Sequence, residues 1–205
     1  MKKMLSAALL SAMVFVSYAS VVNAATVSKG PFTTSAVVQS ALDITVVLKK
    51  NDFAGATITS MDFGRLIDIG TGTLRSSPTS TTGTGAVDAF ISPNNQGLPY
   101  TITQTGTAMS NGATTLPAGA LTVVPVYAAA DNGGQAKPAG ATVGTAGSWV
   151  GTRTLYTSET GAASARTIQA IYSVTDDPAA GSTGAVLQSQ AGGTYTGTVT
   201  ISITA

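Results

Sequence analysis

The longest regular pattern of hydrophobic and polar positions lies near the N-terminus of the chain. Over 32–48 the even positions are mostly apolar, and they read Phe32, Thr34, Ala36, Val38, Ser40, Leu42, Ile44, Val46 and Leu48. Period two is typical of a β-strand that buries one of its faces. Because a strand usually has about five or six residues, so long a run predicts two strands in tandem, with a break near 39–41.

A second alternating run occupies the other end of the chain. Over 193–205 the odd positions include Tyr195, Val199, Ile201 and Ile203, and the even positions are all Thr or Ser. This pattern predicts one strand over 194–204 with a buried face and a wet face. No further strand follows it in the sequence, so we expect its outer edge to be free. A free edge beside an apolar face is a template for pairing unless something fills it.

Shorter β-rich runs and turn signals alternate along the rest of the chain. The runs lie at 58–66, 87–91, 99–105, 121–128, 152–157 and 167–174. Clusters of Gly, Pro, Asn and Asp separate them at 70–85, 92–97, 131–147 and 176–193. Short strands with turns between them, and without a long amphipathic helix, predict an all-β, antiparallel sandwich or barrel. We expect one domain with minimal helix.

The first 24 residues have the features of a secretory signal peptide. Lys2 and Lys3 give a short positive region, an apolar stretch follows, and Val22–Ala24 forms a small-x-small cleavage site. We expect cleavage before Ala25 and export of the mature chain. A retained membrane anchor is the alternative, which the serines within the stretch disfavour.

Composition narrows the possible chemistry. The chain has 205 residues, 9% charged residues, a net charge of +1, no His and no Cys. These absences exclude Ser-His-Asp and Cys-His catalysis, imidazole and thiolate metal ligands, and disulfides. Ten basic residues without a cluster give no footprint for nucleic acid. We therefore expect no catalytic residue, no metal, no cofactor and no nucleic-acid partner.

Several features leave other interpretations open. Asp176 and Asp177 could hold a hard cation, but adjacent acids in a Gly-Pro-Ala loop are more often a solvated turn. Trp149 could stack on a sugar, so a secreted carbohydrate-binding or adhesive protein is the alternative function; a lone Trp is more often packed in the core. A hydrolase would need convergent carboxylates, and none stand out. The segment 32–38 could also be an ordinary edge strand of a complete sandwich.

Four motifs, in order, resemble the chaperone-usher pilins of the archaic class, which share the spore coat protein U domain. They are the alternating Thr34–Ala41, Met61–Gly64 (resembling Leu-x-Phe-Gly in that family), Pro99–Gly106 (resembling that family's Tyr-x-Ile-x-x-x-x-Gly, with one residue fewer before the glycine) and Gly192–Thr204. Together they span nearly the whole mature chain. The chain departs from many of these pilins in lacking the disulfide between the first and second strands.

The resemblance implies an incomplete immunoglobulin-like antiparallel β-sandwich that lacks its last strand and is completed by donor-strand exchange. The chain would then divide into a signal peptide (1–24), a donor-strand extension (25–40) and a pilin sandwich (41–205). A periplasmic chaperone would first lend a strand, and at the outer-membrane usher the extension of an identical subunit would replace it. The expected product is an extracellular fimbrium that supports adhesion and biofilm formation.

The two alternating runs supply the residues for this exchange. The donor strand would present its even positions, which are Phe32, Thr34, Ala36 and Val38. The acceptor groove, where the chaperone would also bind, would be formed by Tyr195, Val199, Ile201 and Ile203. A receptor, if there is one, cannot be named from the sequence.

Overall fold

The computed structural model describes residues 42–50, 55–68, 70–76 and 85–205. The predicted signal peptide and donor extension lie outside these residues. The described strands are β1 (Asp43–Lys50), β2 (Thr57–Ile58), β3 (Leu66–Asp68), β4 (Thr73–Ser76), β5 (Val87–Asn94), β6 (Thr101–Gly106), β7 (Leu121–Val126), β8 (Thr142–Val143), β9 (Gly147–Ser148), β10 (Gly151–Thr157), β11 (Ile168–Val174), β12 (Val186–Leu187) and β13 (Val199–Thr204). Three single-turn 3-10 helices accompany them: η1 (Ala118–Ala120), η2 (Ala129–Asn132) and η3 (Pro178–Ala180).

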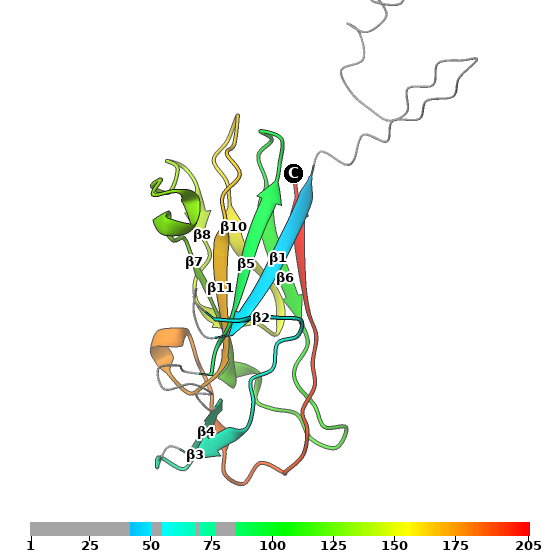
Figure 1. The fold of residues 1–205 in the computed structure, drawn as a ribbon. Helices are drawn as coiled ribbons and strands as arrows, with labels where there is room; N and C mark the ends of the chain where they lie inside the picture. Colours follow the sequence, from blue (N-terminus) through cyan, green and yellow to red (C-terminus); the bar gives the residue numbers. More distant parts are fainter. Residues whose placement is uncertain (1–41, 51–54, 69, 77–84) are drawn as a thin grey trace, which may run out of the picture. The chain divides into compact units, whose positions relative to one another are not determined.

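The strands form three antiparallel sheets, so the predicted all-β, antiparallel fold is confirmed. Their orders are β2-β1-β5-β11-β7-β9, β13-β6-β10-β8 and β12-β4-β3. The two larger sheets enclose a common core (Figure 1), as in a β-sandwich. Within the described part of the chain, no helix has the length and apolar character needed to span a membrane.

The core is densest between the centres of the two larger sheets. Strand β5 lies between β1 and β11, and it is buried on both faces from Val87 to Ile91. Strands covered on both sides are apolar at nearly every position, which is why this run does not alternate. An aromatic row crosses the core, because Phe63 stacks on Trp149 at 5.1 Å between ring centroids and Trp149 contacts Tyr172 at 5.7 Å.

Five of the predicted runs are strands in the structure. The runs at 87–91, 99–105, 121–128, 152–157 and 167–174 correspond to β5, β6, β7, β10 and β11. Each is a β-branched or aromatic run bounded by turn residues, and its pairing partner is one of the other long strands. Strand β5 continues to Asn94, so the predicted turn at 92–97 begins later than expected.

The predicted strand at 58–66 is wrong. Only its two ends are extended, in β2 and β3, and the backbone between them is irregular. The Asp62 carboxylate accepts a hydrogen bond from Gly64 N at 2.8 Å, and Gly64 has a φ of 67°. This turn directs Phe63 into the core, where it is 7% exposed.

The predicted strand at 194–204 is too long, because β13 begins only at Val199. Gly197 packs so closely on the neighbouring segment that a Cβ atom would lie 3.1 Å from Thr107 O, and Thr196 exchanges two backbone hydrogen bonds of 2.9 Å with Ser110. Three predicted loops also contain strands that were not expected. The short strands β4, β8 and β12 lie within 70–85, 131–147 and 176–193.

Candidate functional site

Strand β13 lies at the edge of its sheet and has one neighbour among the described strands, β6. Its odd residues, Val199, Ile201 and Ile203, are half-buried and contact the core, while the even residues are exposed. The pairing register explains this division, since Ile201 lies opposite the buried Gln104 and Ile203 opposite the buried Ile102. An edge strand with three apolar residues turned inward but only half covered has room for a neighbour on its free side.

Strand β1 forms the opposite side of the same opening. Leu42, Ile44 and Leu48 are half-buried against the core, and Val46 is 38% exposed. The short strand β2 pairs with β1 only at Leu48 and Lys49, and it leaves the edge of β1 over 43–47 without a described strand beside it. The two edges therefore present apolar residues from both sheets to one opening.

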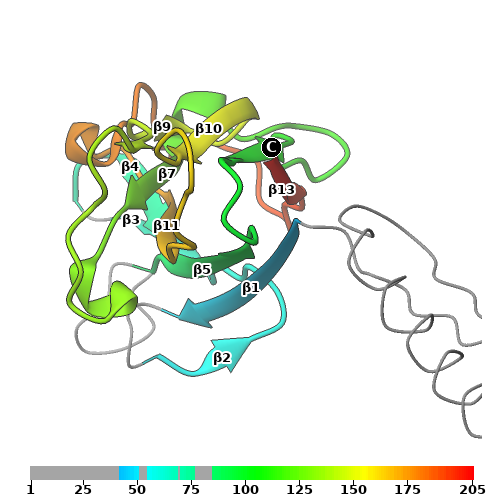
Figure 2. The ribbon, with the colours of Figure 1, turned by 90° about the horizontal axis from the view of Figure 1, so that it is seen from above.

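The two edges diverge along their length. In Figure 1 the start of β1 lies beside the end of β13, and from there β1 runs away from β13 toward the lower part of the molecule. Figure 2, seen from above, shows the same closeness at this end and the same separation farther along. At the wide end lies a cavity of about 360 Å³ between Leu48 of β1 and Val199 of β13. Phe63, Met109 and Trp149 also line it. We call the space between β1 and β13, together with this cavity, the groove.

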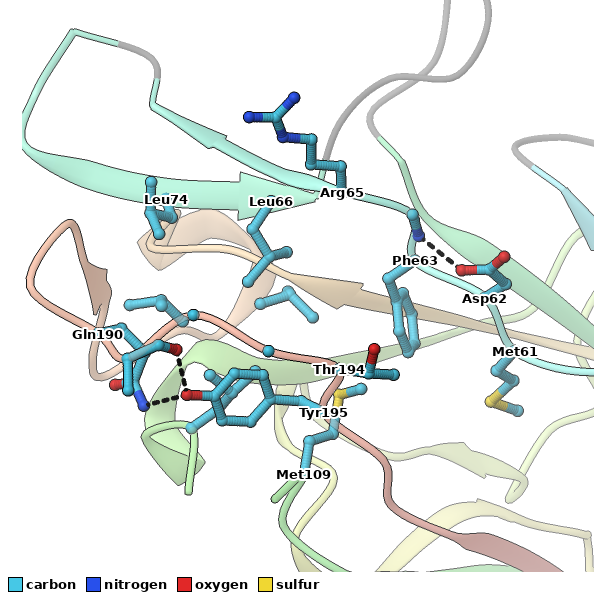
Figure 3. Close-up of a pocket in the computed structure, with 17 residues that line it drawn as sticks. Met61, Asp62, Phe63, Arg65, Leu66, Leu74, Met109, Gln190, Thr194 and Tyr195 are labelled. Atoms are coloured by element: carbon cyan, nitrogen blue, oxygen red, sulfur yellow. Dashed lines mark hydrogen bonds between the residues drawn. The ribbon is translucent and has the colours of Figure 1, made fainter. Parts of the chain in front are cut away.

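A second cavity, of about 430 Å³, adjoins the groove beyond Val199 (Figure 3). It lies among β3, β4 and the segment 190–195, and Leu66 and Leu74 form apolar parts of its wall. Four residues line both cavities: Met61, Phe63, Met109 and Tyr195. The two cavities are therefore neighbours that share a wall.

Tyr195 belongs to this shared wall and not to the ladder of β13. Its hydroxyl accepts a hydrogen bond from Gln190 Nε2 at 2.9 Å and donates one to Ala191 O at 2.6 Å, as Figure 3 shows. The same hydroxyl lies 2.8 Å from Thr114 Oγ1. The structure thus places three of the four predicted acceptor residues on β13, and the fourth at the end of the groove.

The residues that line the cavity of the groove are uncharged. Asp62 and Arg65 line only the second cavity. Burial raises the pKa of the Tyr172 hydroxyl well above its ordinary value of 10, so the phenol beside Trp149 stays neutral at physiological pH. An apolar groove with a free backbone edge can bind an extended peptide by adding it as a strand.

The residues considered for other chemistry do not converge. Asp176 forms an ion pair with Arg75, whereas Asp177 caps η3 through a 2.9 Å hydrogen bond from Ala179 N. Within the described ranges, no three acidic, His or Cys side chains gather in a way that could hold a metal ion. Trp149 is 2% exposed between Phe63 and Tyr172, so its ring faces cannot receive a sugar.

Sequence reasoning missed part of the groove. The predicted donor residues Phe32, Thr34, Ala36 and Val38 lie outside the described residues. Met61, Phe63 and Met109 were not assigned to the site, although Phe63 is a lone aromatic residue between Asp62 and Gly64, a pattern that fits a turn carrying one buried side chain. The cavities could not be foreseen, because they depend on how three sheets meet.

Comparisons of the chain with family models, with curated proteins and with solved structures found no significant match. Function is therefore inferred from the groove and from the residues around it.

Proposed function

We propose that this chain is a structural pilin that polymerises into a surface fibre by donor-strand complementation. In this proposal the sandwich is immunoglobulin-like and lacks its last strand. The observation that carries it is the opening between β1 and β13, where half-buried apolar residues of both sheets face a free backbone edge and a cavity of about 360 Å³.

The chemistry of the groove suits an extended peptide. Every second residue of β13 offers an outward N–H and C=O group to a new strand. Val199, Ile201 and Ile203 offer apolar contacts at every second position. A bound strand with small or apolar residues in the same period would fill the opening and gain roughly 1.5–3 kcal/mol for each large side chain that it buries. The described side chains that line the cavity of the groove include no charged group, and its polar lining consists of Thr59, Ser60, Tyr195, Thr196 and Thr198.

The occupant proposed is the segment 25–40 of another copy of the chain. Its even residues Phe32, Thr34, Ala36 and Val38 have the required period. The run from Gly30 to Leu42 carries no charge, which matches the uncharged lining of the groove. Each copy would then supply one donor segment and one groove, so identical copies would form a linear polymer.

The remaining parts of the proposal follow the path of an exported subunit. The segment 1–24 would direct export, a periplasmic chaperone would cover the groove of the free subunit, and an outer-membrane usher would exchange that cover for the next donor segment. The fibre would be extracellular and support adhesion and biofilm formation. We propose no catalytic role and no cofactor for the chain.

Engineered cysteines test whether the donor segment lies at β13. The chain has no Cys, so every disulfide comes from the introduced pair. Ser35 is the centre of the predicted donor strand, and Thr200 and Ser202 are exposed near the centre of β13. We expect the double variants Ser35→Cys/Thr200→Cys or Ser35→Cys/Ser202→Cys to give covalent ladders longer than dimers after oxidation.

Single cysteine variants are the control, because each can form dimers at most. The variant Ala36→Cys/Ser202→Cys is a second control, in which the donor residue would face the core and form few links. Fibres that assemble without a covalent ladder from either double variant would contradict the proposal.

A further inference from the structure

We infer that Tyr195 ends the groove and thereby limits the size of the side chain that an incoming strand can place beside Val199. Tyr195 would be a specificity-determining residue for the donor segment. This inference rests on the proposed function, and it assigns a role to a residue that lies outside the β13 ladder.

The first observation is the shared wall. Both cavities contact Tyr195, so its side chain stands where the space beside Val199 meets the space of about 430 Å³ beyond it. Met61 and Met109, which also belong to this wall, have flexible side chains that can move aside. Phe63 is held by stacking on Trp149.

The second observation is that the Tyr195 ring is anchored at both ends. At the tip, the hydroxyl is bonded to Gln190 Nε2 and Ala191 O. At the backbone, the adjacent Thr196 is bonded to Ser110 in both directions at 2.9 Å. A side chain fixed in this way cannot yield to a larger neighbour without breaking hydrogen bonds, so it acts as a stop rather than as an adjustable filling.

The consequence concerns the end of the donor strand. A strand that pairs with β13 and reaches the level of Val199 would meet the Tyr195 ring with its next inward residue. With the ring present, the available space is limited to the cavity of about 360 Å³. Without the ring, this space would open into the second cavity and accept a larger side chain.

A pair of matched substitutions tests the stop in the full-length chain. The inward positions of the donor segment run from Phe32 to Val38. Only one of these two residues can lie beside Val199. We therefore compare Phe32→Trp with Val38→Trp, each alone and each combined with Tyr195→Ala. Polymer is measured as sheared surface material that stays assembled in cold detergent.

We expect one of the two Trp substitutions to lower the amount of polymer by roughly tenfold or more, because overpacking a filled site is destabilising. Tyr195→Ala should restore polymer for that substitution only. Tyr195→Phe keeps the ring but removes the hydrogen bonds that hold it, so it should restore polymer for that same substitution only in part. Tyr195→Leu serves as a milder variant with a smaller side chain if Tyr195→Ala lowers the amount of folded subunit.

The outcomes separate the two claims. If the unsubstituted chain forms no polymer, the proposed function fails and this inference fails with it. If the chain polymerises but both Trp substitutions are tolerated, or if Tyr195→Ala rescues both or neither, Tyr195 does not end the groove and the proposed function is unaffected.

Discussion

The two sides of the sandwich, where the edges of the two larger sheets meet, differ in how they are closed. On one side, the segment 142–148 bridges the sheets, because β8 pairs with β10 of the four-stranded sheet and β9 pairs with β7 of the six-stranded sheet. On the other side, β1 and β13 face each other with a cavity between their far ends and without a described strand that joins them.

On the closed side, short strands and satisfied backbone groups protect the sheet edges. Its strands have only two residues each, and Gly144 lies so close to β10 that its N donates to Leu155 O at 2.9 Å. The Arg153 guanidinium donates to Ser148 O and Thr145 O at 3.0 Å and so satisfies carbonyl groups there. Short strands and satisfied backbone groups are common protections of sheet edges.

On the open side, among the described residues, such protection is limited to the two-residue strand β2, which pairs with β1 at Leu48 and Lys49. Strand β13 has six residues, a regular alternation and no charged side chain, and its inward residues remain half-exposed. This contrast between a sealed edge and a long, apolar, regular edge is what the proposed pairing of a partner strand with β13 would require. The predictions below test this contrast between the two sides.

The largest effect on stability is expected from Trp149→Ala. Trp149 follows the sealing strand β9, is 2% exposed and also forms the floor of the groove. Removing a buried Trp side chain should lower the free energy of unfolding by about 3–5 kcal/mol, measured by denaturant unfolding of the mature chain. Leu98→Ala is the control, since Leu98 is 43% exposed and should change stability little. Similar losses in the two variants would show that the aromatic row is not central to the core.

A smaller effect is expected from Gly144→Ala on the closed side. A Cβ atom there would lie 2.1 Å from Thr154 O, so the two backbones would have to separate. We expect a loss of about 1–3 kcal/mol in the free energy of unfolding. Gly192→Ala is the matched control, because it has open space around it and should be nearly neutral. Equal stability of the two variants would mean that the edge is sealed less tightly than the contacts indicate.

The smallest effect is expected from Asp176→Asn, away from both edges. A hydrogen bond from Thr73 lowers the pKa of Asp176, burial opposes this shift, and the ion pair with Arg75 adds to the lowering. The charged carboxylate therefore stabilises the fold at neutral pH, and this contribution is lost as the pH falls below the ordinary value of 3.8.

At pH 7 we expect the free energy of unfolding of this variant to be about 0.2–1 kcal/mol lower than that of the unsubstituted chain. Below pH 4 this difference should become smaller. Fibre assembly should be unchanged. Unfolding curves at several pH values, with fibre counts beside them, make the measurement. A loss of fibres at unchanged stability would place Asp176 in the assembly surface and weaken the contrast between the two edges.

The long central strands were predictable from local sequence, but the segment 59–65 and the point where β13 begins were not. Strands β6 and β11 coincide with runs of β-branched and aromatic residues, and the strands that pair with them coincide with predicted runs as well. The segment 59–65 reads as a strand by composition, but the turn made by Asp62 and Gly64 overrides that preference. Strand β13 is shorter than the alternating run of residues that predicted it, because Gly197 packs against Thr107. These two residues are ninety positions apart in the sequence.

The candidate site was predictable in part for the same reason. Alternation in the last strand identified Val199, Ile201 and Ile203, since period two is a local property. The sealing strands β8 and β9, the shared wall at Tyr195 and both cavities depend on contacts between distant segments. No pattern within a short window carries that information, so they had to be read from the structure.

The central claim is that the inward face of β13 receives a strand from a partner, and neighbouring substitutions test it most directly. Ile201→Asp places a carboxylate on the half-buried face opposite Gln104, whereas Thr200→Asp places the same charge one residue away on the exposed face opposite Thr105. Burying an unpaired carboxylate costs several kcal/mol. Each variant is co-expressed with the proposed periplasmic chaperone and usher. Its co-purification with the chaperone is measured, and surface fibres are counted. The account predicts loss of both chaperone capture and fibres for Ile201→Asp, and nearly normal behaviour for Thr200→Asp. Equal behaviour of the two variants would contradict it.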